Sequence, residues 1–278
     1  MAYQAPIQRN APTAFLFLVD QSGSMADRMA SSEKTKAQFV ADVLNRTFMD
    51  LVVRCTKSDG VRNYFHVGVI GYGAQGAANS LQGVLSQQIL NPISAVGEGP
   101  LRIESRKRKV DDGAGGIVEQ TVKFPVWFEP LASGGTPMCE AIRKAGQELA
   151  AWCDAHPNSY PPTVLHVTDG ESTDGDPEAL ASKLREFSTD DGPVLLLNLH
   201  VSSQGGSPIS FPASPGGLPD RYAESLFRMS SPLPSHLITA VQSKGHHVSG
   251  EARGYVFNAE AGEIVEFFDI GTRASQLR

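Results

Sequence analysis

An uninterrupted apolar run at residues 15–19 limits the folds open to this chain more than any other feature. It ends abruptly at Asp20 and opens into a polar loop. A run without polar alternation is typical of a strand buried on both faces, as in a parallel sheet covered by helices. Residues 64–72, 163–168 and 194–201 have a similar character. We therefore expect a central, mostly parallel sheet.

Amphipathic helices are predicted between these strands, because apolar residues recur there at steps of three and four. The stripes lie at residues 39–52, 138–152 and 180–187, and short helices are expected further on at about 222–229 and 235–241. The first helix is expected to start at a cap-like segment, 31–33, and Thr136 is placed to cap the second, with Pro137 in its first turn. Alternating strands and helices predict an α/β fold: a doubly wound sheet with helices on both faces.

Residues 81–130 do not fit this alternation. Two extended runs, 102–110 and 117–124, flank a glycine-rich turn and predict a projecting β-hairpin. A Pro, Gly and Ser-rich loop at 202–219 is too short to indicate an interdomain linker, and a last strand and helix are expected within 254–272. We expect one enlarged domain over residues 1–278, with a core at about 14–201, C-terminal elements to 272 and an insert at about 101–130.

The composition narrows the function classes. Hydrophobic residues make up 41% and charged residues 19% of the chain, which argues against disorder. A net charge of -6 gives no reason to bind nucleic acid or an anionic membrane, and we read the basic run 106–109 as a solvated hairpin face. No signal-like start or membrane-length apolar segment is present, so a cytoplasmic location is expected. The three cysteines are expected to be reduced thiols.

Oxygen-bearing side chains gather where strands are expected to end. Asp20, Ser22 and Ser24 alternate along one loop, and Thr136 and Asp169 follow at two other strand-to-helix junctions. In a parallel sheet the carboxyl ends of the strands share one edge, where ligands bind. Mg²⁺ prefers such oxygen ligands. Singly, these segments could be ordinary helix caps, but together they favour a metal site.

Three motifs, DQSGSM, SGGTPM and VTDGEST, together resemble the von Willebrand factor A (VWA) family over about residues 14–201. The resemblance implies a metal-ion-dependent adhesion site. In it, Ser22, Ser24 and Thr136 would bind Mg²⁺, or else Mn²⁺ or Ca²⁺, directly. Asp20 and Asp169 would act directly or through water.

With two formal negative charges among five ligands, the bound ion would stay electrophilic and accept an Asp or Glu carboxylate from a partner protein. The expected function is therefore a metal-dependent protein-interaction module. The resemblance is closest to intracellular bacterial proteins of the TerY type, which implies an adaptor in assemblies with ATPases, kinases or phosphatases. The alternative is a metal-dependent hydrolase, but no nucleophile with an orienting base is evident, so we do not expect an enzyme.

Other polar residues have simpler explanations. Asp174 and Asp176 hint at a calcium loop, but the EF-hand pattern is absent and helix capping explains Asp176. His166 and His200 fall in predicted strands, where core or edge positions are more common than metal ligation.

Overall fold

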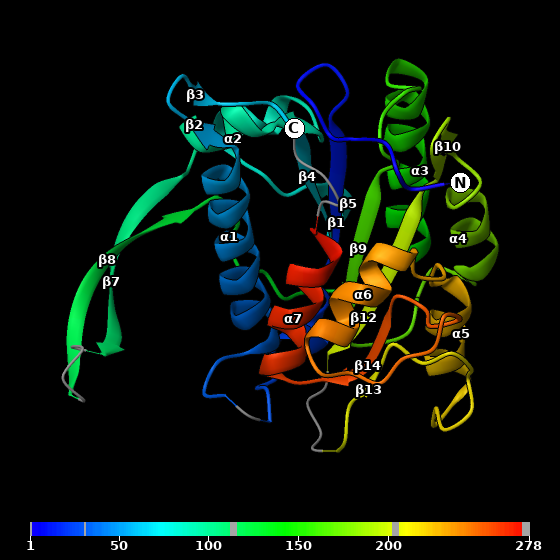
Figure 1. Ribbon diagram of the computed structural model, residues 1–278. Coiled ribbons are helices and arrows are strands. Elements are labelled where there is room, and N and C mark those ends of the chain that lie inside the picture. Colours follow the sequence, from blue (N-terminus) through cyan, green and yellow to red (C-terminus); the bar gives the residue numbers. More distant parts are fainter. Residues whose placement is uncertain (1, 31, 112–115, 202–205, 274–278) are drawn as a thin grey trace.

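The computed structural model describes residues 2–30, 32–111, 116–201 and 206–273. A central sheet runs through the molecule (Figure 1). Across the sheet its strands are β13 (Ile209–Ser210), β14 (Tyr255–Ala259), β12 (Leu195–Val201), β9 (Thr163–Thr168), β1 (Thr13–Asp20), β4 (Phe65–Gly73) and β5 (Gly76–Asn79), with β6 (Asn91–Pro92) beside β4.

The central strands are parallel and the short outer ones are not. β1 pairs in parallel with β4 and β9, β9 with β12, and β12 with β14. β5, β6 and β13 pair in antiparallel fashion. The chain builds outward from β1 through β4 to β5 and then returns to the other side at β9, so the strand order reverses between β1 and β9. In doubly wound sheets this switch point is where ligands bind, at the carboxyl ends of the strands.

Helices cover both faces of the sheet because its central strands are apolar on both sides. In β1, Phe15, Phe17 and Val19 pack into one core cluster, and Leu16 and Leu18 into another. The first face carries α1 (Lys36–Cys55), α2 (Ile93–Glu98), α6 (Ser235–Ser243) and α7 (Ala261–Gly271); the second carries α3 (Met138–Ala155), α4 (Glu178–Leu184) and α5 (Arg221–Met229). The predicted α/β class, with helices on both faces, is confirmed.

The start of α1 differs from the prediction. The prediction placed the cap at residues 31–33, but the helix begins at Lys36 and its N-cap is Thr35. Residue 31 lies outside the described residues. Thr35 and Gln38 form a reciprocal capping box: Gln38 N donates to Thr35 Oγ1 at 3.2 Å, and Thr35 N donates to Gln38 Oε1 at 3.0 Å. This pair satisfies two backbone donors at once, which favours it over a serine acting alone.

The start of α3 also differs from the prediction. The hydroxyl of Thr136 does not cap this helix. The carboxylate of Asp174, on the loop after β9, does so instead: it accepts hydrogen bonds from Cys139 N and Glu140 N, both at 2.9 Å. An anion at this position also complements the positive end of the helix dipole.

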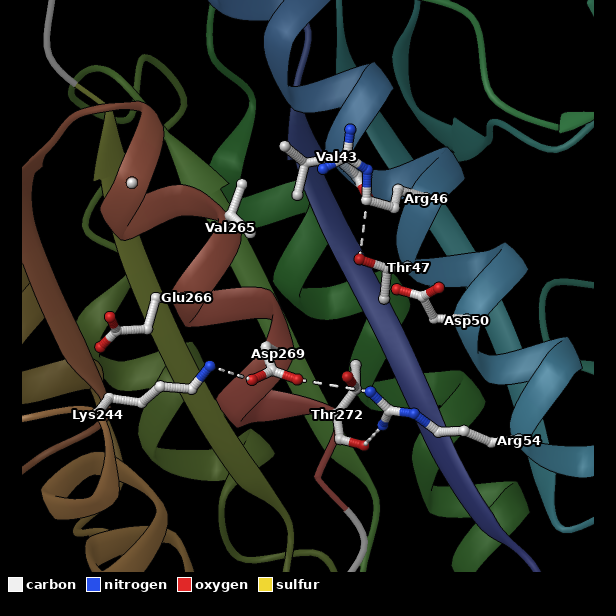
Figure 2. A pocket seen from close by; sticks show the side chains of 11 residues that line it. Val43, Arg46, Thr47, Asp50, Arg54, Lys244, Val265, Glu266, Asp269 and Thr272 are labelled. Carbon is white, nitrogen blue, oxygen red and sulfur yellow. Dashed lines mark hydrogen bonds and ion pairs between the residues drawn. The ribbon is translucent and has the colours of Figure 1, made fainter. Parts of the chain in front are cut away.

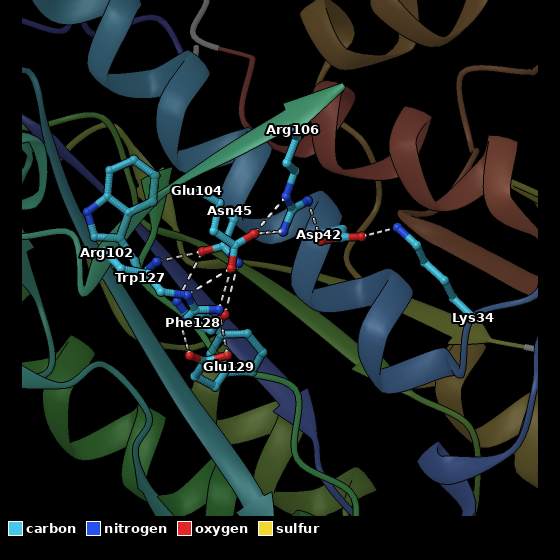
Figure 3. Close-up of polar contacts among 9 residues, drawn as sticks. All are labelled: Lys34, Asp42, Asn45, Arg102, Glu104, Arg106, Trp127, Phe128 and Glu129. Atoms are coloured by element: carbon cyan, nitrogen blue, oxygen red, sulfur yellow. Dashed lines mark hydrogen bonds and ion pairs between the residues drawn. The ribbon is translucent and has the colours of Figure 1, made fainter. Parts of the chain in front are cut away.

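The predicted hairpin is present as β7 (Arg102–Asp111) and β8 (Ile117–Val126), which project from the body beside α1 (Figure 1). Its turn, at 112–115, lies outside the described residues. Arg106 of the basic run stacks over Phe124 at 3.6 Å and donates to Asp42 of α1 at 2.8 Å (Figure 3). Lys107 pairs with Glu119 at 3.0 Å. These contacts tie part of the basic run to the protein itself.

The smaller elements lie in connections. They are the 3-10 turns η1 (Gly23–Ala26) and η2 (Gly83–Gln87) and two-residue strand pairs, β2 (Thr56–Lys57) with β3 (Gly60–Val61) and β10 (Ser188–Thr189) with β11 (Gly192–Pro193). Cys55, Cys139 and Cys153 are buried free thiols, as predicted. Among the described helices, none has the length and apolar character needed to cross a membrane.

Candidate metal centre

Asp20 is the last residue of β1 and Asp169 directly follows β9, at the point where the strand order reverses. Val19 of β1 lies opposite Val167 of β9, so the two aspartates come at adjacent strand ends. Asp20 is only 1% exposed. Its Oδ1 accepts a hydrogen bond from Ser22 N at 2.8 Å, and its Oδ2 accepts one from Thr168 Oγ1 at 2.7 Å. Burial raises the pKa of Asp20, while the hydrogen bonds from Ser22 and Thr168 act in the opposite direction.

The side chains of Ser22, Ser24 and Asp169 form a continuous chain of oxygens. Ser22 Oγ lies 3.1 Å from Ser24 Oγ, which donates to Asp169 Oδ1 at 2.7 Å. Ligands that bind Mg²⁺ at about 2.1 Å occupy neighbouring octahedral corners about 3 Å apart. The separations and the chemistry of these oxygens therefore fit a hard divalent cation.

Thr136 lies on a loop that is fastened directly to the first one. Gly23 N donates to Gly134 O at 2.9 Å, and Ser133 N donates to Gln21 O at 2.7 Å. Gly134 has a φ of 79°, and a Cβ there would lie 2.4 Å from Ala74 Cα, so only glycine fits this approach. Thr136 itself is 6% exposed.

The five predicted side chains are thus not all joined. Within the described part of the chain, the Thr136 hydroxyl makes no hydrogen bond to Asp20, Ser22, Ser24 or Asp169. Its backbone N–H instead donates to Thr173 Oγ1 at 2.9 Å. Hydrogen bonds link the other four in two groups, with Ser22 common to both.

Lys36 belongs to this site, although the sequence reasoning missed it. Its Nζ donates to Asp169 Oδ2 at 2.6 Å and to Ser24 O at 3.4 Å. The side chain of Lys36 is 3% exposed and that of Asp169 is 0% exposed. One signal could have found it: Lys36 is the first residue of α1, where the helix dipole disfavours a cation unless an anion lies close by.

Asp174 does not form the calcium loop that its spacing hinted at. Besides capping α3, its Oδ1 accepts a hydrogen bond from Ser172 Oγ at 2.8 Å. Burial acts to raise its pKa, but hydrogen bonds from Cys139, Ser172 and Glu140 outweigh this and hold the pKa below its ordinary value. Both carboxylate oxygens are engaged in holding the loop after β9 against α3.

His166 lies in the core, as predicted. It is 0% exposed, and burial lowers its pKa to about 4. Its Nε2 lies 2.6 Å from Tyr72 Oη and its Nδ1 lies 2.7 Å from Asn198 Oδ1. Because the Asn198 oxygen can only accept, Nδ1 carries the proton and Nε2 accepts from the tyrosine. The imidazole is therefore a satisfied structural group.

A pocket of about 460 Å³ lies elsewhere, between α1 and α7 (Figure 2). Three of its charged groups pair with one another: Lys244 Nζ lies 2.8 Å from Asp269 Oδ2, and Arg54 Nη2 lies 3.5 Å from Asp269 Oδ1. Arg54 is in the last turn of α1, whereas the candidate metal centre adjoins the first. The pocket is therefore separate from this centre.

No three or more His, Cys, Asp or Glu side chains in the described ranges gather in a way that could hold a metal ion. The candidate centre is of another kind, because hydroxyl oxygens supply much of its donor set. The carboxylates of Asp20 and Asp169 and the ammonium of Lys36 together carry a formal charge of about -1.

No family model matches the chain, and no curated protein matches it. Among solved structures, it is similar to proximal thread matrix protein 1 from the mussel byssus, with 13% identity and a TM-score of 0.44 over 80% of this chain and 42% of that one. It is also similar to the SpRpn10 VWA domain, with 10% identity and a TM-score of 0.41 over 69% and 77% of the two chains. A third similar structure is the manganese-loaded TRAP protein of Plasmodium vivax, with 15% identity and a TM-score of 0.34 over 68% and 57%.

The chain thus spans less than half the length of the mussel protein. Likenesses at such identities and TM-scores identify neither a partner nor a metal for this chain. The α/β fold class rests on its own strand order and connections, with β1 and β9 at the switch point and the candidate metal centre at their carboxyl ends.

Proposed function

We propose that this chain is a VWA-type binding module that holds Mg²⁺ or Mn²⁺ at the carboxyl edge of its sheet and grips a carboxylate of a partner protein. The supporting observation is the chain of oxygens from Ser22 through Ser24 to Asp169, with separations of 3.1 and 2.7 Å at the switch point of the sheet. The bound cation would supply a Lewis-acidic position for an anionic oxygen.

The residues of the centre divide this work. Ser22 and Ser24 would offer neutral oxygens that leave the cation electrophilic, and Asp169 would offer a charged one. Asp20 holds the loop in shape through Ser22 N and is itself oriented by Thr168. Thr136 would contribute from the adjoining loop.

Two surface features near this edge would influence partner choice. A groove of about 410 Å³ lies beside the centre; among its lining residues are Gly170, Glu171, Arg221 and Tyr222. On the other side, the hairpin is tied by Arg106 to Asp42 of α1, which also pairs with Lys34 in the loop before α1 (Figure 3). Loops and projections on a rigid scaffold commonly carry specificity.

We further propose that the module is a cytoplasmic adaptor and not an enzyme, working in an assembly with an ATPase, kinase or phosphatase. The carboxylate oxygens of Asp20 and of Asp169 all accept hydrogen bonds from the protein, so neither aspartate is placed as a free general base. Robust hydrolysis of phosphoesters or peptides with Mg²⁺, abolished by Asp20→Ala, would overturn this part.

A metal-dependent pull-down tests the function. Tagged wild type, Asp20→Ala and a control, Asp154→Ala, whose side chain lies on an exposed position of α3, are each incubated with native cytoplasm in Mg²⁺ or chelator. We expect partners that bind wild type and Asp154→Ala in Mg²⁺ and are lost both with chelator and with Asp20→Ala. Partners retained under every condition would contradict a metal-mediated grip.

A further inference from the structure

The ammonium group of Lys36 takes up one oxygen of a carboxylate that the proposed metal centre needs. Lys36 Nζ lies 2.6 Å from Asp169 Oδ2, while Asp169 Oδ1 accepts from Ser24 Oγ at 2.7 Å. Both partners of the ion pair are nearly inaccessible, with side-chain exposures of 3% and 0%. A buried pair of this kind is held strongly, because separating it leaves an uncompensated charge.

We propose that Lys36 is a built-in competitor of the divalent cation for Asp169, and that this competition sets how tightly the centre holds the cation. This inference rests on the proposed function and adds its regulation. An ammonium and a divalent cation that share one carboxylate repel each other. At a separation of about 5 Å this repulsion amounts to about tenfold in affinity even in the dielectric of water.

Asp27 offers Lys36 a second acceptor. Its Oδ2 lies 3.7 Å from Lys36 Nζ, and its side chain is 60% exposed. The ammonium can therefore turn from Asp169 towards Asp27 without losing all anionic contact. With a cation bound, Asp20, Asp169, Lys36 and the ion would sum to a charge of about +1, and the nearby Asp27 carboxylate would bring this sum to about zero.

Mn²⁺ titration of the purified full chain tests the proposal, with the free ion followed by electron paramagnetic resonance. Lys36→Gln keeps an N–H donor and loses the charge, Lys36→Met loses both, and Lys36→Arg keeps the charge. We expect Lys36→Gln and Lys36→Met to tighten Mn²⁺ binding about tenfold, and Lys36→Arg to leave it close to wild type. If Lys36 merely positioned Asp169 for the ion, Lys36→Gln and Lys36→Met would weaken Mn²⁺ binding instead, which would overturn the proposal.

Thermal unfolding supplies a second readout, because Lys36→Met leaves the Asp169 carboxylate buried without its cation. We expect Mn²⁺ to raise the melting temperature of Lys36→Gln and Lys36→Met more than that of wild type. An equal or smaller rise in both variants would refute competition. Lys36→Gln keeps this test usable where Lys36→Met does not fold in chelator.

A double-mutant cycle tests the role of Asp27. Asp27→Asn should weaken Mn²⁺ binding severalfold in wild type, because Lys36 loses its alternative acceptor, and change it little in the Lys36→Gln background. Equal effects in both backgrounds would show that Asp27 acts only through its own charge, and would refute the idea that the Lys36 ammonium turns from Asp169 towards Asp27.

The outcomes separate this inference from the proposed function. Mn²⁺ binding by wild type that is abolished by Asp20→Ala and unchanged by Lys36→Gln would leave the metal centre standing and reject the competition. Absence of Mn²⁺ binding by wild type and by all three Lys36 variants would reject the metal centre, and the competition with it.

Discussion

Asn45 of α1 holds the base of the projecting hairpin, and its replacement by leucine provides a quantitative test of the fold. The side chain is 2% exposed. Its Oδ1 accepts from Trp127 N at 2.8 Å and Phe128 N at 3.0 Å, and its Nδ2 donates to Phe128 O at 2.9 Å (Figure 3). Asn45→Leu would therefore deprive two N–H groups and one carbonyl of a partner in a buried place.

The expected loss follows from these contacts. Each orphaned N–H costs about 2 kcal/mol, the carbonyl costs less because it has a second lone pair, and burying the leucine returns about 1–2 kcal/mol. We expect the free energy of unfolding to fall by about 3 kcal/mol, measured by urea denaturation in chelator with an unchanged m-value.

Thr47→Val is the matched control. Thr47 Oγ1 donates to Val43 O in its own helix at 2.9 Å, so its removal orphans no backbone donor, and we expect a loss below about 1 kcal/mol. A loss below about 1 kcal/mol for Asn45→Leu as well would refute the claim that Asn45 satisfies these backbone groups.

Three further predictions follow from other contacts. Asp174→Ala should lower the free energy of unfolding by about 1–2 kcal/mol at neutral pH, measured by chemical denaturation. Because the folded-state pKa of Asp174 is lowered, this difference from wild type should shrink as the pH falls through the carboxyl range. A difference that stays constant with pH would contradict this prediction. His166 has a pKa of about 4 in the folded state against about 6.5 in the unfolded chain, so NMR should show a neutral imidazole in the native protein above pH 5. Because the unfolded chain binds this proton first, the free energy of unfolding should fall as the pH drops from 6.5 towards 4. Titration of His166 near pH 6.5 in the native protein would contradict this prediction. Residues 103–125 can be replaced by a short Gly-Ser turn, because the hydrogen bond from Leu101 N to Val126 O, at 2.7 Å, holds the two ends of the hairpin together. This replacement should reduce partner capture and leave the Mn²⁺ affinity unchanged. Undiminished capture would show that the hairpin does not influence partner choice.

Much of the architecture could be predicted because it follows from repeating patterns along the chain. The apolar run at 15–19 requires burial on both faces, and the structure places its alternate residues in two separate core clusters. The hairpin was predictable because two extended runs flank a glycine-rich turn. The predicted start of α1 was wrong because Ser32 and Thr35 are both residues that can cap a helix, and the reciprocal hydrogen bonds with Gln38 select Thr35.

The site was predictable to the extent that strand ends are predictable. Asp20 and Asp169 follow apolar runs, so a parallel sheet brings them to one edge. The cap of α3 was missed because Asp174 lies far along the chain from Cys139 and Glu140, and no local pattern connects them.

Local order along the chain thus accounts for the α/β class, the sheet edge and the oxygen-rich loops, because strands and helices repeat over a few residues and their side chains alternate predictably. Contacts between distant segments account for the rest. Lys36 meets Asp169, which lies 133 positions further along the chain. In the described chain, Thr136 is not hydrogen-bonded to the other four residues predicted as metal ligands. Such pairings depend on how loops pack at the end of the sheet, and that packing leaves no periodic trace in the order of the amino acids.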